Sequence, residues 1–152
     1  MTIAYLMCGP QGAGKSTKAS EIAKLERATI ISGDEIREEL YGSAEIQGNW
    51  VDIHDRIEEM VADVVAYGQG VILDGTYHKR AYREEAITLL KSYGYDKVEA
   101  IVCFPSLSTC MARNWSRDRN VPDYVLQETY EVFQRESKNI LKEDFSRVTF
   151  VY

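Results

Sequence analysis

The sequence has few cysteines, no long apolar run and no excess of positive charge. Its 3 cysteines show neither metal-binding nor redox spacing, and Cys8 and Cys103 fall in expected core strands, so buried free thiols are predicted. No apolar stretch approaches the roughly 20 residues that cross a bilayer. The N-terminus also lacks a basic segment followed by an apolar one, which argues against a secretion signal. These absences predict a cytoplasmic protein without a membrane anchor.

The charge balance is acidic, with a formal net charge of −6. This argues against an extended nucleic-acid surface, which usually needs a clustered basic face. The acidic balance is compatible with a small basic site that binds one or two phosphates. Hydrophobic residues make up 45% of the 152 residues, which is enough for a chain of this length to bury a globular core.

Apolar runs alternate with helical patterns from end to end of the chain. The expected strands cover residues 3–8, 29–32, 71–74, 98–104 and 148–152, and the expected helices cover 15–25, 34–40, 50–67, 79–93, 106–116 and 122–141. This alternation predicts an α/β fold with a five-stranded, mostly parallel sheet between helices. The sequence shows no internal repeat. Because the last expected strand ends at the final residue, we expect a single domain spanning residues 1–152.

The most specific motif is GPQGAGKST, residues 9–17, which follows an apolar run that ends at Cys8. It fits the phosphate-binding pattern G-x-x-x-x-G-K-[ST] between a strand and a helix, which argues against a chance glycine turn. In such a loop, backbone N–H groups point at the phosphates, Lys15 reaches the β- and γ-phosphates, and the Ser16 hydroxyl is a Mg²⁺ ligand. We therefore expect the loop to bind a nucleoside triphosphate through Gly9, Pro10, Gln11, Gly12, Ala13, Gly14, Lys15, Ser16 and Thr17.

Polar residues follow the second and third expected strands, at the sheet edge where ligands of parallel sheets bind. Arg37 lies three residues after Asp34, so both side chains share one helix face. The carboxylate could take the proton of an attacking hydroxyl while the guanidinium holds a phosphate. The alternative is that Asp34 caps the helix and Arg37 makes a surface pair. Asp74 ends the third strand, where a carboxylate near Mg²⁺ is typical, although it could also be a simple turn signal.

A third segment, residues 113–122, carries Arg113, Arg117 and Arg119. We interpret it as a lid that closes over the triphosphate and supplies arginines to the developing negative charge. The alternative is a solvated charged loop whose arginines pair with Asp118 and Asp123.

Taken in order, GPQGAGKST, GDEIR, ILDGT and RNWSRDRNVPDYVL resemble the 5′-hydroxyl polynucleotide kinase domain of the bacteriophage end-healing enzyme. The resemblance implies a P-loop NTPase fold of the kinase type with a helical lid that bears arginines. It implies transfer of the γ-phosphoryl group of ATP, with Mg²⁺, to the 5′-hydroxyl of a nucleic acid or nucleotide. Lys15 and Ser16 take the phosphate and metal positions of that family.

The same resemblance implies roles for the acceptor side and the lid. Asp34 matches the general base, Arg37 the arginine that binds the phosphate next to the attacked nucleoside, and Asp74 an acidic residue that arranges the site. Arg117 matches the lid arginine that contacts the triphosphate, with Arg113 and Arg119 as helpers.

The chain departs from the family pattern in several places. Glu35 stands where the family member has a second aspartate, the lid is one residue shorter, and no phosphatase domain follows, so we expect no 3′-phosphatase activity. A kinase for small molecules is the main alternative: a nucleoside, sugar, antibiotic or zeta-toxin-like phosphotransferase. Arg37 argues against it, since it anticipates a phosphate beside the hydroxyl. A catalytically idle nucleotide-binding module is the other alternative, and the intact Lys15, Asp34 and Asp74 argue against that.

Overall fold

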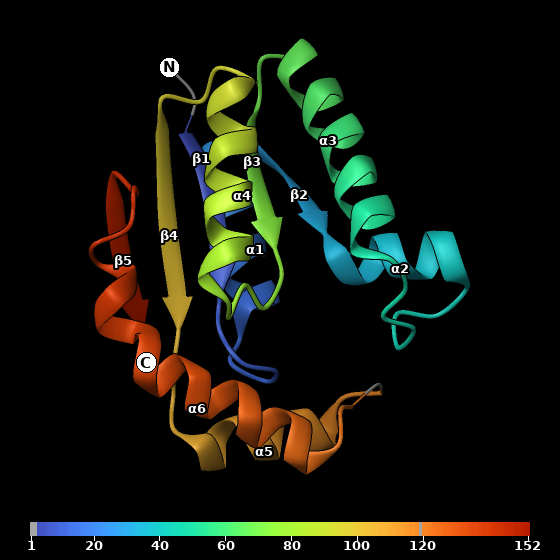
Figure 1. The fold of residues 1–152 in the computed structure, drawn as a ribbon, viewed down its shortest axis with the longest axis vertical. Helices are drawn as coiled ribbons and strands as arrows, with labels where there is room; N and C mark the ends of the chain where they lie inside the picture. Colours follow the sequence, from blue (N-terminus) through green and yellow to red (C-terminus); the bar gives the residue numbers. More distant parts are fainter. Residues whose placement is uncertain (1–2, 119) are drawn as a thin grey trace.

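Five strands form a single sheet at the centre of the fold (Figure 1). In the computed structural model, which describes residues 3–118 and 120–152, they are β1 (Ile3–Cys8), β2 (Ala28–Ser32), β3 (Gly70–Asp74), β4 (Lys97–Cys103) and β5 (Arg147–Val151). Their order is β2-β3-β1-β4-β5. Each neighbouring pair is parallel, so the sheet predicted to be mostly parallel is parallel throughout.

Helices connect the strands and cover both faces of the sheet. They are α1 (Lys15–Glu26), α2 (Gly33–Tyr41), α3 (Trp50–Ala66), α4 (Arg80–Ser92), α5 (Leu107–Ser116) and α6 (Asp123–Ile140). The predicted elements are all present, and their ends agree with the structure within one residue. In α3 the buried side chains Ile53, Ile57, Val61 and Val64 follow the helical spacing from which that helix was predicted.

The central strand β1 buries side chains on both of its faces. Ala4 and Leu6 belong to a cluster that includes side chains of α3 and α4, whereas Tyr5 and Met7 belong to a second cluster with α1 and α5. Because successive strand residues point to opposite faces, this near-continuous apolar run is what a two-sided core requires. β1 is therefore buried up to Cys8, where the glycine-rich loop begins.

The carboxyl ends of β1, β2 and β3 lie next to one another, which brings distant parts of the sequence together. Ser32 at the end of β2 is paired in register with Asp74 at the end of β3. The chain leaves the neighbouring β1 at Cys8 and enters the loop that leads to α1. Helices α5 and α6 lie across this end of the sheet (Figure 1).

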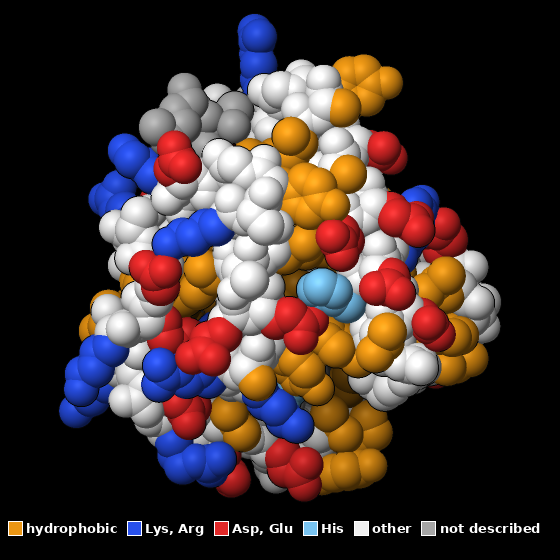
Figure 2. All heavy atoms as spheres, turned by 45° about the horizontal axis from the view of Figure 1, so that its top comes forward, with side chains coloured by type: hydrophobic (Ala, Val, Ile, Leu, Met, Phe, Trp, Pro, Cys, Tyr) orange, Lys and Arg blue, Asp and Glu red, His pale blue; other side chains and the backbone are white. Residues whose placement is uncertain are grey.

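The surface mixes charges of both signs. On the face shown in Figure 2, acidic and basic side chains are interspersed around apolar ones, with no broad basic region. None of the helices in the described ranges combines the length and the apolarity that a bilayer crossing needs.

Candidate active site

A cleft of about 1360 Å³ opens at the carboxyl ends of β1, β2 and β3. It brings together the phosphate-binding loop and the three further segments that the sequence singled out. Its lining includes Gln11, Gly12, Ala13, Gly14, Lys15, Ser16, Thr17, Asp34, Arg37, Asp74, Arg113 and Arg117. Gly9 and Pro10 stand at the start of the loop, and their carbonyl groups accept hydrogen bonds from the Lys15 ammonium.

The loop between β1 and α1 packs so closely against its neighbours that side chains are excluded at two glycines. A Cβ on Gly9 would collide with the carbonyl oxygen of Cys103, and a Cβ on Gly12 would collide with that of Cys110. Gly12 also has φ +75°, a backbone conformation that glycine adopts without strain. The Gly9 N–H donates to the carbonyl of Thr76 at 3.1 Å, which ties the loop to the segment after β3. The loop backbone is therefore held in place before any ligand binds.

The N-terminus of α1 is prepared for an anion. Its N-cap residue is Gly14, and within the described chain neither a side-chain cap nor an acidic residue occupies the first turn. The unpaired N–H groups and the helix dipole favour negative charge there. The Arg113 guanidinium lies next to Gly14, since its Nη1 is 3.3 Å from the position a Cβ would take. The loop residues thus fit the phosphates of a nucleoside triphosphate.

Lys15 is held inside this loop. Its Nζ donates to the carbonyls of Gly9 and Pro10, each at 2.8 Å. Burial lowers the pKa of Lys15, while the nearby Asp74 carboxylate acts in the opposite direction. The ammonium is therefore bound by the loop carbonyls and is within electrostatic reach of the carboxylate at the end of β3.

Ser16 and Asp74 form the part of the site that suits a divalent cation. The Ser16 hydroxyl donates to Asp74 Oδ2 at 3.0 Å, although the two residues are 58 positions apart. Burial raises the pKa of Asp74, and Lys15 together with the hydrogen bond from Ser16 opposes this shift. Hydroxyl and carboxylate oxygens are the hard ligands that Mg²⁺ prefers, so this pair fits a Mg²⁺ site.

Asp34 and Arg37 form an ion pair on the side of the cleft formed by α2. The distance from Arg37 Nη1 to Asp34 Oδ1 is 3.4 Å, and the side chains are 18% and 54% exposed, respectively. Arg37 Nε also donates to the carbonyl of Gln47 at 3.4 Å. The N-cap of α2 is Ser32, whose hydroxyl accepts from the N–H of Glu35, so the alternative that Asp34 caps this helix is wrong. The pair itself is present, and it lies in the cleft.

The arginine-bearing lid is organised by Asn114, a residue that the sequence analysis missed. This side chain is fully buried, and its Nδ2 donates to the carbonyl of Val121 at 2.8 Å. Its Oδ1 accepts from the N–H of Val121 at 3.1 Å and from Arg117 Nη2 at 3.0 Å. Asn114 therefore closes the loop after α5 and orients Arg117. An asparagine between arginines carries no signal of such a role in the sequence.

Arg119, which was interpreted as a helper, lies outside the described residues. Asp123, which the alternative reading paired with the arginines, accepts a hydrogen bond from the Trp115 indole at 2.8 Å.

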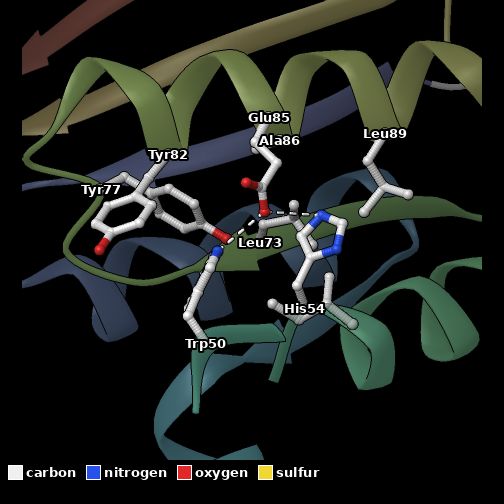
Figure 3. Close-up of a pocket in the computed structure, with 9 residues that line it drawn as sticks. Trp50, His54, Leu73, Tyr77, Tyr82, Glu85, Ala86 and Leu89 are labelled. Atoms are coloured by element: carbon white, nitrogen blue, oxygen red, sulfur yellow. Dashed lines mark hydrogen bonds and ion pairs between the residues drawn. The ribbon is translucent and has the colours of Figure 1, made fainter. Parts of the chain in front are cut away.

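A small apolar pocket between α3 and α4 adjoins the cleft, and Glu85 contacts both Trp50 and His54 across it (Figure 3). Glu85 points from α4 toward α3, where it accepts from Trp50 Nε1 at 3.0 Å. Its Oε1 also lies 3.1 Å from His54 Nε2. These contacts clasp the two helices together, which gives the pocket a structural role.

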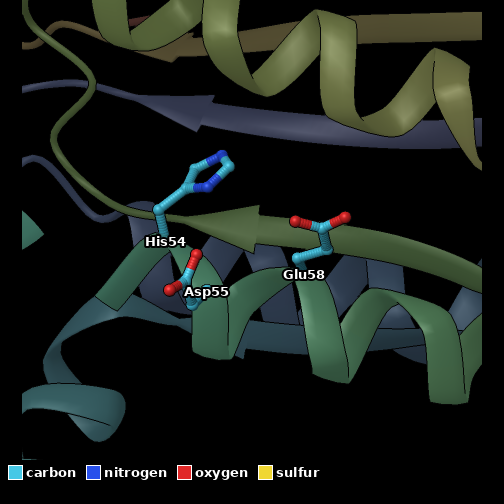
Figure 4. Close-up of side chains that lie close together, drawn as sticks. All are labelled: His54, Asp55 and Glu58. Atoms are coloured by element: carbon cyan, nitrogen blue, oxygen red, sulfur yellow. The ribbon is translucent and has the colours of Figure 1, made fainter. Parts of the chain in front are cut away.

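His54, Asp55 and Glu58 lie close together on α3, with one possible ligand atom of each within 4.8 Å of the others (Figure 4). His54 is already paired with Glu85, and Glu58 accepts a hydrogen bond from the Tyr93 hydroxyl at 3.0 Å. We therefore assign no metal to this group.

Comparisons with known proteins place the chain in a family. The family model described as an AAA domain, AAA_33, matches residues 5–136, which include the loop, both acidic segments and the lid. No curated protein matches the sequence.

Solved structures share the fold at low identity. The structure of the Pnkp1/Rnl/Hen1 RNA repair complex matches with a TM-score of 0.79 and 16% identity over 95% of this chain and 47% of the other, so the chain spans about half the length of that protein. A gluconokinase from Sinorhizobium meliloti 1021 matches with a TM-score of 0.63 and 19% identity, over 97% of this chain and 80% of the other.

A deoxyadenosine kinase from M. mycoides matches with a TM-score of 0.56 and 18% identity, over 98% of this chain and 89% of the other. These similarities establish the α/β P-loop NTPase fold. Because the family model covers most of the chain and its phosphate-binding loop, the chain belongs to the AAA domain family AAA_33, as a P-loop kinase-like domain.

Proposed function

We propose that this P-loop domain is an ATP- and Mg²⁺-dependent kinase that phosphorylates the 5′-hydroxyl of a nucleic acid or nucleotide. One observation carries the proposal: Asp34 and Arg37 lie paired in the same cleft as Lys15 and the phosphate-binding loop. A hydroxyl acceptor needs a base, and an acceptor that carries a phosphate needs a cation beside that base. Both are present on the side of the cleft formed by α2.

The donor half of the site holds ATP. The loop N–H groups and Lys15 bind the β- and γ-phosphates, while Arg113 and Arg117 approach from α5 and the lid. Ser16 and Asp74 would hold Mg²⁺, which when bound neutralises charge on the phosphate oxygens. Most of the catalysis then comes from fixed positions and fixed charges.

The acceptor half supplies the nucleophile. The 5′-oxygen forms a bond to the γ-phosphorus as the bond from that phosphorus to the leaving oxygen of ADP breaks. Asp34 takes the proton of the hydroxyl, and general bases of this kind contribute about 10²–10⁴-fold to rate. Its 54% exposure leaves the carboxylate accessible to the substrate.

Arg37 selects an acceptor that carries a phosphate. Its side chain is mostly buried and is oriented by Asp34 and by the carbonyl of Gln47. A guanidinium held in this way binds a phosphate bidentately, at little further entropic cost. A plain sugar or nucleoside offers no such group, which is why a 5′-hydroxyl next to a 3′-phosphate fits best.

The test is a labelling assay with γ-labelled ATP and Mg²⁺. Acceptors are a 5′-hydroxyl oligonucleotide, a nucleoside 3′-monophosphate, and a panel of nucleosides and sugars that includes gluconate and deoxyadenosine. We expect label on the first two. Label on a nucleoside or sugar alone would refute the proposal in favour of a small-molecule kinase, and ATP binding without any transfer would favour an idle module.

Variants sharpen this test. Asp34→Asn should lower kcat about 10²–10⁴-fold while ATP affinity stays unchanged, and the exposed Asp96→Asn is its control. Arg37→Gln should raise KM for phosphate-bearing acceptors about 10- to 150-fold, because it removes a hydrogen bond to a charged group and the loss of such a bond weakens binding by about this factor. The exposed Arg147→Gln is the matched control. Full activity of Asp34→Asn would show that the base is assigned wrongly.

A further inference from the structure

The acceptor side of the cleft continues past Arg37 to a wall that phosphoryl transfer itself does not use. This wall is lined by Trp50, His78, Lys79 and Tyr82. The hydrogen bond from Arg37 to the carbonyl of Gln47 places the segment that leads into Trp50 beside the phosphate-binding guanidinium. A nucleic-acid strand that extends beyond the phosphate bound by Arg37 therefore meets this wall.

Lys79 is the cation of this wall. It is exposed at the N-terminus of α4, and it takes part in none of the ion pairs found among the described residues. Its Nζ lies 5.8 Å from the centre of the Tyr82 ring, which holds the ammonium in place without neutralising it. In the described chain, the first turn of α4 has no acidic residue and no side-chain cap. The position therefore favours an anion.

The rest of the wall is aromatic. The Trp50 and Tyr82 rings have centroids 5.0 Å apart at 49°, and the His78 ring lies 6.4 Å from that of Tyr82. Burial lowers the pKa of His78, with a smaller contribution from Lys79, so the imidazole is neutral near pH 7. His78 Nδ1 is buried and has no hydrogen-bond partner among the described residues. Aromatic faces beside a cation are the means by which proteins hold unpaired bases of nucleic acids.

A buried ion pair holds in place the segment that leads into this wall. Arg83 is fully buried, pairs with Glu143, and donates through Nη1 to the carbonyl of Tyr77 at 3.0 Å. Tyr77 has φ +44°, a strained conformation for a bulky residue, and it directly precedes His78 and Lys79. A site fixed in advance loses less entropy when it binds a flexible strand.

We infer that this wall binds the second nucleotide of the acceptor: Lys79 binds its phosphate and the Tyr82 ring stacks on its base. The substrate is then an unpaired 5′ end of at least two nucleotides. The inference rests on the proposed function and narrows its substrate class. It adds no chemical step.

The first test compares Lys79→Gln with the wild type on two acceptors, a nucleoside 3′-monophosphate and a dinucleotide with a 3′-phosphate. We expect kcat/KM for the dinucleotide to fall about fivefold, as for an exposed charge contact, and to stay unchanged for the mononucleotide. The plot of log kcat/KM against log salt for the dinucleotide should become shallower by about 0.7, as for one lost phosphate contact on a single strand. Lys91→Gln, on the same helix and paired with Asp144, is the control.

The second test addresses stacking. We compare kcat/KM for the dinucleotide with kcat/KM for the same molecule with an abasic second position. In Tyr82→Leu the ratio of these two values should be lower than in the wild type by about fivefold or more. Tyr82→Phe keeps the ring and should keep that preference. Thermal melting of both variants shows that they are folded, and a duplex with a flush 5′ end should be a poorer acceptor than the single strand.

The outcomes separate the two proposals. Equal losses on both acceptors, or no loss on either, in an enzyme that phosphorylates oligonucleotides would overturn the second-nucleotide site and leave the proposed function standing. A duplex preferred over a single strand would overturn the stacking role of Tyr82. A wild type that labels no nucleic acid would overturn both.

Discussion

The buried ion pair between Arg83 and Glu143 gives the sharpest prediction about stability. Arg83 Nε and Nη2 donate to the two Glu143 oxygens at 2.7 and 2.8 Å, and Nη1 donates to the Tyr77 carbonyl at 3.0 Å. The relative exposure of the two residues is 0% and 8%. Breaking one partner leaves a buried charge without compensation, which costs far more than the pair itself contributes.

Arg83→Met should therefore lower the free energy of unfolding by about 3–5 kcal/mol. For a domain of this size that corresponds to a fall in Tm of about 6–20 °C. The double variant Arg83→Met with Glu143→Leu removes both charges and should recover most of this loss. The Tyr77 carbonyl still lacks its donor in the double variant, so kcat/KM should stay lower by roughly tenfold or more because the segment after β3 is misplaced.

Urea unfolding followed by circular dichroism measures the stability, and the labelling assay measures the activity. Arg80→Met is the matched control, because the pair of Arg80 with Glu84 on the same helix is exposed, and no measurable change is expected. The reasoning is refuted if Arg83→Met is as stable as the wild type, or if the double variant is less stable than the single one.

Two further predictions concern the loop and pH. Gly12→Ala should weaken ATP binding by about tenfold or more, since the new Cβ meets the Cys110 carbonyl and displaces the loop. Gly68→Ala, at φ +69° with open space around it, should cost about 1 kcal/mol of stability and leave ATP affinity unchanged in calorimetry. Burial lowers the pKa of His78 below its ordinary value of about 6.5. As the pH falls below about 6.5, the unfolded chain therefore binds the proton before the folded chain does, and the free energy of unfolding decreases. His78→Gln should be less sensitive to acid than the wild type between about pH 6.5 and 5 in urea titrations; equal slopes would contradict this.

Much of the fold could be predicted because its signals are local. The apolar period of α3 and the glycines that end strands and begin turns act within a few residues, so the element ends agree with the structure within one residue. The N-cap of α2 is an exception. Ser32 and Asp34 are both residue types that favour this position, and the alternative interpretation, in which Asp34 is the cap, was wrong. Local propensity left the two unresolved, and the backbone geometry decided in favour of Ser32.

The residues that line the candidate site could be predicted from the sequence, whereas the contacts between them could not. The loop motif identified Lys15 and Ser16, yet Ser16 meets Asp74 across 58 positions because β3 lies beside β1. The role of Asn114 depends on the return of the chain at Val121, which no local pattern announces. Side chains of these kinds have many possible partners, and the sheet order selects among them.

The sequence by itself determined the alternation of strand and helix, the parallel sheet and the phosphate-binding loop, because each follows from spacing along the chain. The tertiary structure alone decided that Ser16 donates to Asp74 across 58 positions, and that Arg83 and Glu143, 60 positions apart, form a buried pair. The physical reason is that burial and pairing are non-local. They depend on which strands become neighbours, and the order β2-β3-β1 brings the phosphate-binding loop, Asp34, Arg37 and Asp74 to one edge of the sheet.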